Sequence, residues 1–447
     1  MNILLVEPNY RSTFPPLGLL RISAFLKTIG IEPKFVRGMD NDCRTEHWDK
    51  VYISSLFTFE LPRTVKTINY YKNSVTNPYT DIIVGGVGAT LMPEYITQNS
   101  ACQVFVGPLC DSNMLGMGEA PIASFTPDYD ILKTIDKKYV PESAYFTRVT
   151  TGCIRKCAFC AVPVLEPKFD YLKSLREQIE EVDRKYGPKR DLIVLDNNIL
   201  ALKNVEDVLE EIKSLGFEKG SRFNGRKRNV DFNQGIDARL ITPQIAQKLG
   251  EIAISPVRVA FDHISVEKPY RQGVKNLARA GIRHIMTYVM FNFQDTPEEF
   301  YARLRINMDL AEENNLKITS FPMKYCPIDQ VDRHYISPNW NWRYLRGIQC
   351  ILNATHGVVS TNPKFFNLSF GSTAEEFKTI VSMPDNFIIY RSRYADLASQ
   401  WKHDFELLNG EQKSCLFDIL KTRHDTKLNM QSDDPNIKTV LDYYDMK

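Results

Sequence analysis

The 447-residue sequence lacks long hydrophobic runs and any strong net charge. No apolar stretch reaches the roughly 18 residues of a membrane span, and no charged-then-apolar leader precedes a small-residue cleavage site. The formal net charge of +2 gives no general attraction to nucleic acid or to an anionic membrane. We therefore expect a cytoplasmic protein with no membrane partner, and charge does not indicate a nucleic-acid partner.

Cysteine is also scarce, with nine in the whole chain, and a fourth metal ligand is missing where three of them gather. The segment "TTGCIRKCAFCAVP", residues 150–163, contains Cys153, Cys157 and Cys160, and the next Cys or His is His263. A structural zinc site usually has four protein ligands, whereas three thiolates suit a [4Fe–4S] cluster that leaves one iron open. A cluster is therefore predicted, with zinc or purely structural thiols as the alternative.

Short apolar runs alternate with helical patterns before the cysteines. The run "NILLVEP" precedes residues 15–30, whose apolar positions recur at helical spacing, and four more short runs follow up to residue 108. This alternation predicts a doubly wound parallel-sheet domain of the Rossmann type over residues 1–115. Residues 116–144, rich in Pro and Asp, are expected to form a linker.

After the linker the alternation continues in longer units. Six strand patterns, at 145–152, 191–200, 230–240, 256–264, 285–296 and 317–328, are separated by helical patterns, including 170–186 and 297–314. They predict an α/β fold with a partial parallel (β/α)6 barrel over residues 145–330, followed by a mainly helical region at 331–447. The predicted strands end in polar side chains, where parallel barrel enzymes hold their active sites. These are Asp196, Asn197, Asn198, Gln234, Asp237, Arg239, Asp262, His263, Asn292, Gln294, Tyr325 and Cys326.

The three-cysteine loop after the first barrel strand resembles the signature of the radical S-adenosylmethionine (radical SAM) superfamily. The resemblance implies that the cysteines bind three irons of a [4Fe–4S] cluster and that S-adenosylmethionine chelates the fourth. One-electron cleavage then gives a 5′-deoxyadenosyl radical that abstracts a substrate hydrogen, with an electron donor such as flavodoxin or ferredoxin as partner. The implied cofactor contacts are Phe159 near the adenine, together with Asp196, Asn197, Asn198, Gln234, Asp237, Arg239 and Asp262. The usual Gly-Gly-Glu motif is absent.

The N-terminal domain resembles the cobalamin-binding-like domain that often precedes a radical SAM barrel. The segments "PPLGLLRISAFLKTIG", "SSL" and "GGVGATLMPE" carry this resemblance. It implies cobalamin contacts at Ser54, Leu56, Gly85 and Gly86, and methyl transfer to an unactivated carbon if cobalamin is bound. The Asp-x-His-x-x-Gly motif that supplies a lower cobalt ligand is missing from "PNYRSTFPP", so a domain that keeps the fold without cobalamin is equally open.

Two other functions are open from the sequence. A methylthiotransferase-like enzyme acting on a nucleic acid or protein shares the "CAFCAVP" wording but needs a second cluster, for which Cys43, Cys102 and Cys110 are the candidates. We expect these three to be packing or incidental thiols. An iron–sulfur electron carrier or redox sensor needs neither an open iron nor polar strand ends. No catalytic residue is assigned, and the substrate, a small molecule or a macromolecule, is not specified.

Overall fold

The computed structural model describes residues 1–110, 112–117, 120–426 and 432–446. The other positions fall within the predicted domains and linker and lie outside the described residues. The chain forms two compact units: unit 1 is Met1–Gln234, Glu251–Ile254 and Cys326–Tyr335, and unit 2 is Gly235–Gly250, Ser255–Tyr325 and Ile336–Lys447. The predicted boundaries at 115, 144 and 330 remain predictions. Among the described residues, no helix has the length and hydrophobicity needed to cross a membrane.

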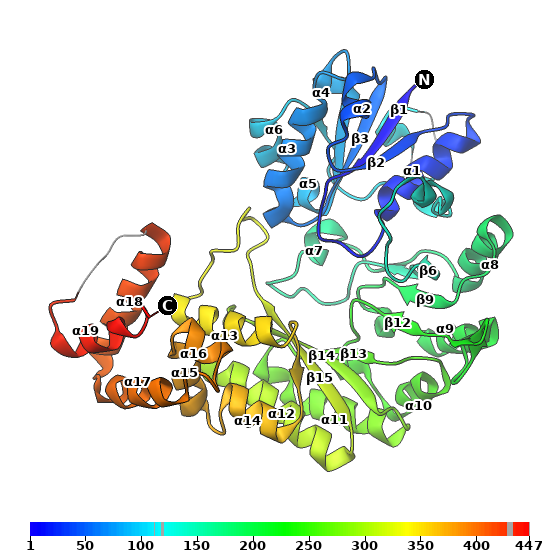
Figure 1. Ribbon diagram of the computed structural model, residues 1–447. Coiled ribbons are helices and arrows are strands. Elements are labelled where there is room, and N and C mark those ends of the chain that lie inside the picture. The colour runs from blue at the N-terminus through cyan, green and yellow to red at the C-terminus, as the bar shows by residue number, and fades with distance from the viewer. Residues whose placement is uncertain (111, 118–119, 427–431, 447) are drawn as a thin grey trace. The chain divides into compact units, whose positions relative to one another are not determined.

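Unit 1 begins with a five-stranded parallel sheet in the order β2-β1-β3-β4-β5. Side chains of successive strand residues point to opposite faces, so Leu4 and Val6 join one hydrophobic cluster while Ile3 and Leu5 join another. Helices cover both faces (Figure 1), which confirms the doubly wound arrangement. The strands are β1 (Ile3–Glu7), β2 (Lys34–Arg37), β3 (Lys50–Ser55), β4 (Ile82–Gly86) and β5 (Gln103–Val104). Helix α1 (Leu17–Thr28) covers one face, and α3 (Leu61–Tyr71) and α6 (Pro93–Asn99) cover the other.

The second sheet of unit 1 contains the first three predicted barrel strands, in the order β12-β9-β6 and all parallel. They are β6 (Ala144–Thr147), β9 (Asp191–Val194) and β12 (Val230–Phe232), and α8 (Leu175–Tyr186) and α9 (Val205–Ile212) follow the first two. The predicted strand at 145–152 and helix at 170–186 are both shorter than expected. Residues 150–151 leave β6 to pair with 170–171, and Ser174 caps α8 by accepting a hydrogen bond from the Glu177 amide at 3.2 Å.

Unit 2 contains the other three predicted strands as a parallel sheet, with a short antiparallel strand added at its edge. The strands are β13 (Val257–Ala260), β14 (His284–Phe291), β15 (Lys317–Lys324) and β16 (Val359–Ser360), and the helices between them are α11 (Glu267–Arg279) and α12 (Pro297–Asn314). Helix α12 has the bounds predicted from sequence, because Thr296 and Glu299 form a capping box at its start. The α/β class with parallel sheets is confirmed.

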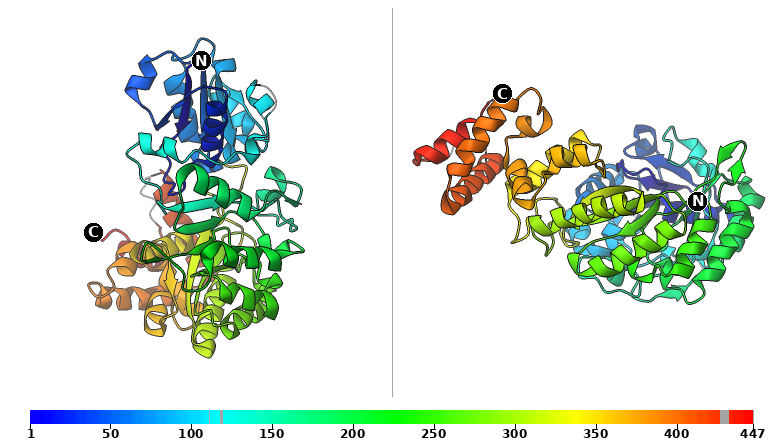
Figure 2. Two further views of the ribbon diagram at one scale, coloured as in Figure 1. Left: turned by 90° about the vertical axis from the view of Figure 1, so that its right-hand side faces the viewer. Right: turned by 90° about the horizontal axis from the view of Figure 1, so that it is seen from below.

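The C-terminal part of unit 2 is mainly helical, as predicted. Its helices are α13 (Trp342–Ala354), α14 (Pro363–Phe370), α15 (Ala374–Ser382), α16 (Asp385–Ile389), α17 (Ala395–Leu407), α18 (Gly410–Thr426) and α19 (Pro435–Asp442). The last three pack on one another (Figure 2) around Trp401, which is fully buried and stacks on Phe405 with 4.7 Å between ring centroids.

Candidate functional site

The three cysteines lie on a loop closed by two short paired strands, β7 (Thr150–Thr151) and β8 (Asp170–Tyr171), which run antiparallel. Next to this pair, the Leu172 amide donates to the Val149 carbonyl at 2.7 Å. Cys153, Cys157 and Cys160 are each half-buried. The loop is therefore held at its base, and its thiols keep access to a ligand.

Gly152, directly before the first cysteine, brings the two ends of this loop together. Its φ is +67°, and a Cβ built there would lie 2.1 Å from the carbonyl oxygen of Lys168. Only glycine combines this left-handed backbone conformation with so close an approach of two chain segments. The position of Cys153 thus depends on Gly152, because glycine has no side chain.

An ion pair between Arg148 and Glu166 spans the loop. The guanidinium donates from Nη1 to Oε1 at 2.5 Å and from Nη2 to Oε2, and Oε2 also accepts the Gly152 amide at 2.8 Å. Burial alone would raise the pKa of Glu166, but the hydrogen bonds and charge of Arg148 outweigh it, so the pKa lies below its ordinary value. A carboxylate that is ionised near neutral pH therefore fixes the turn before Cys153. Neither Arg148 nor Glu166 belongs to a motif that would mark it in the sequence.

Asp196, after β9, is buried and holds the other side of the same turn. Its carboxylate accepts the Val149 amide at 3.0 Å and both the amide and the hydroxyl of Thr150 at 2.6 Å. Burial raises the pKa of Asp196, while these hydrogen bonds and the charge of Arg148 oppose the shift. Its observed partners thus belong to the cysteine loop, and its predicted contact with S-adenosylmethionine stays a prediction.

Backbone and side-chain N–H groups point at two of the sulfurs. The Arg155 amide donates to Cys153 Sγ at 3.3 Å, the Val162 amide to Cys160 Sγ at 3.5 Å, and Asn198 Nδ2 to Cys153 Sγ at 3.5 Å. Such donors stabilise negative charge on thiolate ligands and tune iron–sulfur clusters. The amide oxygen of Asn198 is buried and has no hydrogen-bond partner among the described residues. Three thiolates, oriented donors and an orphaned acceptor fit an iron–sulfur cluster that holds a polar ligand.

The remaining predicted residues of unit 1 lie around this loop and at the next strand end. Asn197 donates from Nδ2 to Glu166 Oε2 at 2.9 Å, Phe159 is half-buried directly before Cys160, and Gln234 is exposed after β12. Within the described ranges, no group of three or more His, Cys, Asp or Glu side chains is arranged to hold a single metal ion.

Unit 2 brings the other predicted residues together at the strand ends. Asp237 Oδ1 accepts both the amide of Arg239, at 3.1 Å, and its Nε, at 2.6 Å. Asp262, directly after Phe261 at the end of β13, is half-buried, yet enough protein surrounds its carboxyl group that burial raises its pKa to about 6. The charges of Arg303 and Arg239 oppose this shift and that of Asp237 adds to it. The predicted residues thus form one group in each unit.

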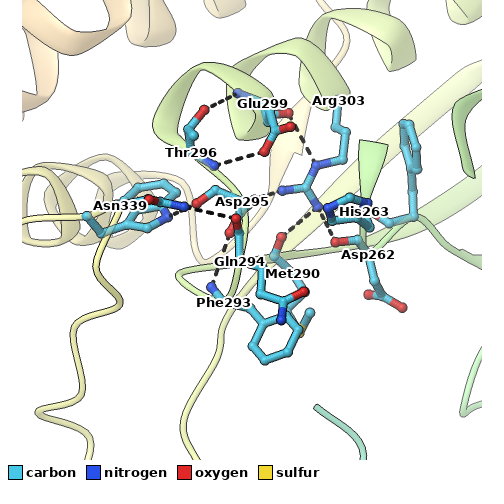
Figure 3. Close-up of polar contacts among 12 residues, drawn as sticks. Asp262, His263, Met290, Phe293, Gln294, Asp295, Thr296, Glu299, Arg303 and Asn339 are labelled. Carbon is cyan, nitrogen blue, oxygen red and sulfur yellow. Dashed lines mark hydrogen bonds and ion pairs between the residues drawn. The ribbon is translucent and has the colours of Figure 1, made fainter. Parts of the chain in front are cut away.

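Sequence reasoning missed Arg303, which is completely buried beside Asp262. Its guanidinium contacts the backbone carbonyls of Asp262, just after β13, and of Met290 in β14, and the carboxylate of Asp295 (Figure 3). A signal was present, because Arg303 lies next to Leu304 and three residues after Phe300, on the apolar stripe of α12. A charged residue in such a stripe indicates a buried partner.

The residues predicted to contact cobalamin lie at the ends of β3 and β4. A Cβ on Gly86, whose φ is +110°, would lie 2.3 Å from the Ser55 carbonyl oxygen, and the Ser54 carbonyl accepts the hydroxyl of Tyr10 at 3.1 Å. Close packing of the two strands thus accounts for Gly86. The short helix α5 (Val87–Leu91) that follows contacts α7 (Val162–Leu165), directly after the cysteine loop. This edge of the N-terminal sheet is therefore adjacent to the cysteines.

Two of the N-terminal cysteines considered for a second cluster are packing residues. Cys43 and Cys102 are buried in the hydrophobic cluster on one face of the N-terminal sheet, and burial raises the pKa of both thiols, that of Cys43 to about 11. Cys110 is exposed. Thiols with raised pKa values are poor metal ligands near neutral pH.

Comparison with solved structures supports the fold. The structure of the radical S-adenosylmethionine methyltransferase TsrM from Kitasatospora setae, with tryptophan substrate and the SAM analogue aza-SAM bound, superposes with a TM-score of 0.51 and 15% identity over 78% of this chain and 76% of that chain. The structure of Streptococcus suis SuiB bound to precursor peptide SuiA gives a TM-score of 0.33 and 12% identity over 47% and 45%. No protein-family model and no curated protein matches the sequence. At this level of identity the comparison shows a shared fold: the chain has the fold seen in the TsrM structure, as the sequence led us to expect.

Proposed function

We propose that the protein is a radical SAM enzyme that holds a [4Fe–4S] cluster through Cys153, Cys157 and Cys160. The observation that carries the proposal is the pre-formed cysteine loop, whose base is fixed by Gly152 and whose sulfurs already receive N–H hydrogen bonds. When bound, the reduced cluster and S-adenosylmethionine would supply, by one-electron cleavage of the sulfonium, methionine and a 5′-deoxyadenosyl radical able to abstract a substrate hydrogen.

The chain's own residues bind and orient these groups. Asn198 offers an unpartnered amide oxygen beside a cluster ligand, which suits the amino group of S-adenosylmethionine. Phe159, next to Cys160, is the proposed contact to the adenine. The other proposed contacts to the cofactor are Asp196, Asn197, Gln234, Asp237, Arg239 and Asp262. We also propose that a reduced flavodoxin or ferredoxin supplies the electron, in a cytoplasmic setting.

The experiment is anaerobic reconstitution with iron and sulfide, followed by incubation with S-adenosylmethionine and dithionite. The wild type should release 5′-deoxyadenosine, and Cys157→Ala should lose both this product and most of the bound iron. Cys415→Ala, at an exposed position on α18, is the matched control and should behave as wild type. If Cys157→Ala keeps its iron, the ligand assignment is wrong. If the wild type holds the cluster but leaves S-adenosylmethionine intact, the protein is an electron carrier or redox sensor instead.

A second candidate is cobalamin-dependent methyl transfer, which one observation favours. The α5–α7 contact puts the strand ends of the cobalamin-binding-like sheet beside the cysteine loop. The loop at 8–16 offers no lower cobalt ligand, because it contains neither Asp nor His. Protein produced with cobalamin should show corrinoid absorbance and form S-adenosylhomocysteine from S-adenosylmethionine. A preparation made under the same conditions that shows no corrinoid absorbance excludes this candidate and leaves the radical SAM proposal standing.

A methylthiotransferase-like reaction is less well supported. It needs a second cluster, yet Cys43 and Cys102 are packing residues in the core. Iron and sulfide analysis separates the two cases, because a single [4Fe–4S] cluster gives about four irons per chain and two clusters give about twice that number.

A further inference from the structure

Arg303 in α12 is a buried charge of unit 2 that contacts four backbone carbonyl groups and one carboxylate. None of its surface is exposed, and its ion-pair partner Asp295 is 2% exposed. Nη2 donates to Asp295, and Nε donates to the Glu299 carbonyl at 3.2 Å. The ion pair neutralises the buried guanidinium and leaves Nη1 to make other contacts.

Nη1 of Arg303 contacts backbone carbonyl groups at the end of the sheet, beyond the last hydrogen bond of the ladder. The last ladder bond between β13 and β14 is donated by the Phe261 amide to the Tyr288 carbonyl at 2.8 Å. Beyond it, Nη1 lies 3.2 Å from the Phe261 carbonyl oxygen and 2.7 Å from that of Asp262. It also lies 2.7 Å from the carbonyl oxygen of Met290 in β14. One guanidinium thus ties the ends of two strands together.

Asp262 is consequently fixed from both sides. Arg303 holds its carbonyl group, and the following residue, His263, caps the next turn by accepting the Ser265 amide on Nδ1 at 3.1 Å. The carboxylate itself points away from the guanidinium (Figure 3) and accepts no hydrogen bond from the described part of the chain. A half-buried carboxylate without a donor is ready to accept hydrogen bonds from a ligand.

We propose that Arg303, neutralised by Asp295, is the positioning residue that aims the Asp262 carboxylate at hydrogen-bond donors of bound S-adenosylmethionine. The inference rests on the proposed radical SAM function. The inference goes beyond that function by assigning a role to Arg303 and Asp295, which do not touch the cofactor. Arginine is required because its three nitrogen atoms contact Asp295, the Glu299 carbonyl and the three strand-end carbonyls separately. The ammonium of a lysine has one nitrogen atom and cannot reach all of these acceptors.

The test is a double-mutant cycle on S-adenosylmethionine binding, measured anaerobically by equilibrium dialysis on the cluster-loaded protein. Arg303→Lys keeps the charge, and Asp262→Asn removes the acceptor charge. Each single variant should weaken binding about tenfold, the usual loss for one aimed charged hydrogen bond. If Arg303 acts through Asp262, the double variant should also be about tenfold weaker, not a hundredfold. Iron content should match wild type in all three.

A purely structural role for Arg303 predicts different results. Losses that multiply to about a hundredfold, or an Arg303→Lys variant that melts earlier but binds normally, would overturn the proposal. Arg305→Lys, at a half-buried arginine two residues along α12, is the matched control and should bind as wild type. If Arg303→Lys does not fold, Asp295→Asn takes its place in the cycle, with the same non-additivity expected. Wild-type protein that loads a cluster but does not bind S-adenosylmethionine would refute the proposed function itself.

Discussion

Substitution of Asp196 by asparagine tests whether the cysteine loop is anchored by the protein or by its ligands. The buried carboxylate accepts the Val149 amide on Oδ2 at 3.0 Å and on Oδ1 at 3.2 Å, and it accepts the Thr150 amide and hydroxyl on Oδ1, each at 2.6 Å. Asparagine has the same shape, and its carbonyl oxygen can keep both Thr150 contacts. Its amide group then faces the Val149 amide, so that two hydrogen-bond donors meet. The change therefore removes the shorter of the two Val149 contacts, leaves the new amide group without an acceptor there, and removes the charge that strengthens the contacts on Oδ1.

These losses can be expressed as a free energy. A buried donor left without an acceptor costs about 1–3 kcal/mol, and hydrogen bonds to a charged group are stronger than neutral ones by about 1 kcal/mol each. We expect Asp196→Asn to destabilise the closed loop by about 2–4 kcal/mol. An opening equilibrium shifted by this amount changes by a factor of about 30 to 1,000. That is enough to lower the iron retained after reconstitution.

The assay compares iron per chain and cluster absorbance with urea unfolding. Asp191→Asn is the matched control, because Asp191 is buried at the other end of β9 and accepts the Asn229 amide at 3.1 Å. Both variants should lose stability, and only Asp196→Asn should lose iron. An Asp196→Asn protein with full iron content and a weaker affinity for S-adenosylmethionine would refute the anchoring argument and make Asp196 a cofactor ligand.

Three further predictions follow from the same structure. Gly152→Ala should abolish cluster retention, because its Cβ would lie 2.1 Å from the Lys168 carbonyl oxygen. The control is Gly187→Ala, where φ is +72° and the space around the new Cβ is open. This control bears only the backbone strain and should keep its iron in the same iron assay. Because burial raises the pKa of Asp262 to about 6, equilibrium dialysis should show the affinity for S-adenosylmethionine falling as the pH drops below that value and levelling off at the roughly tenfold loss expected for Asp262→Asn, and a flat profile would contradict its role as acceptor. The sign for stability is opposite: the folded state binds this proton more tightly, so the contribution of Asp262 to stability falls as the pH rises from the ordinary pKa of 3.8 to about 6. Trp401→Ala should cost about 3–5 kcal/mol and expose α17–α19 to limited proteolysis while the iron content stays unchanged; loss of iron would contradict a purely local effect.

Much of the fold is readable from the sequence because burial follows the period of each element. The alternation of apolar runs and helical stripes predicted the N-terminal sheet and all six later strands, and the bounds of α12 matched because its capping box is local. The strand at 145–152 was predicted too long. Residues 150–151 pair with 170–171, a contact set by the closed loop and by no local propensity.

The sequence by itself determined the chemistry: three thiols on one short segment, polar residues at strand ends, and no fourth ligand. Only the tertiary structure decided which residues hold that chemistry in place, because their partners are distant along the chain. Glu166 and Asp196 reach the turn before Cys153 from two different segments. Arg303 reaches the carbonyl of Asp262 across 41 residues. Hydrogen bonds of this kind carry no sequence period, so they become visible only when the strands and helices are packed.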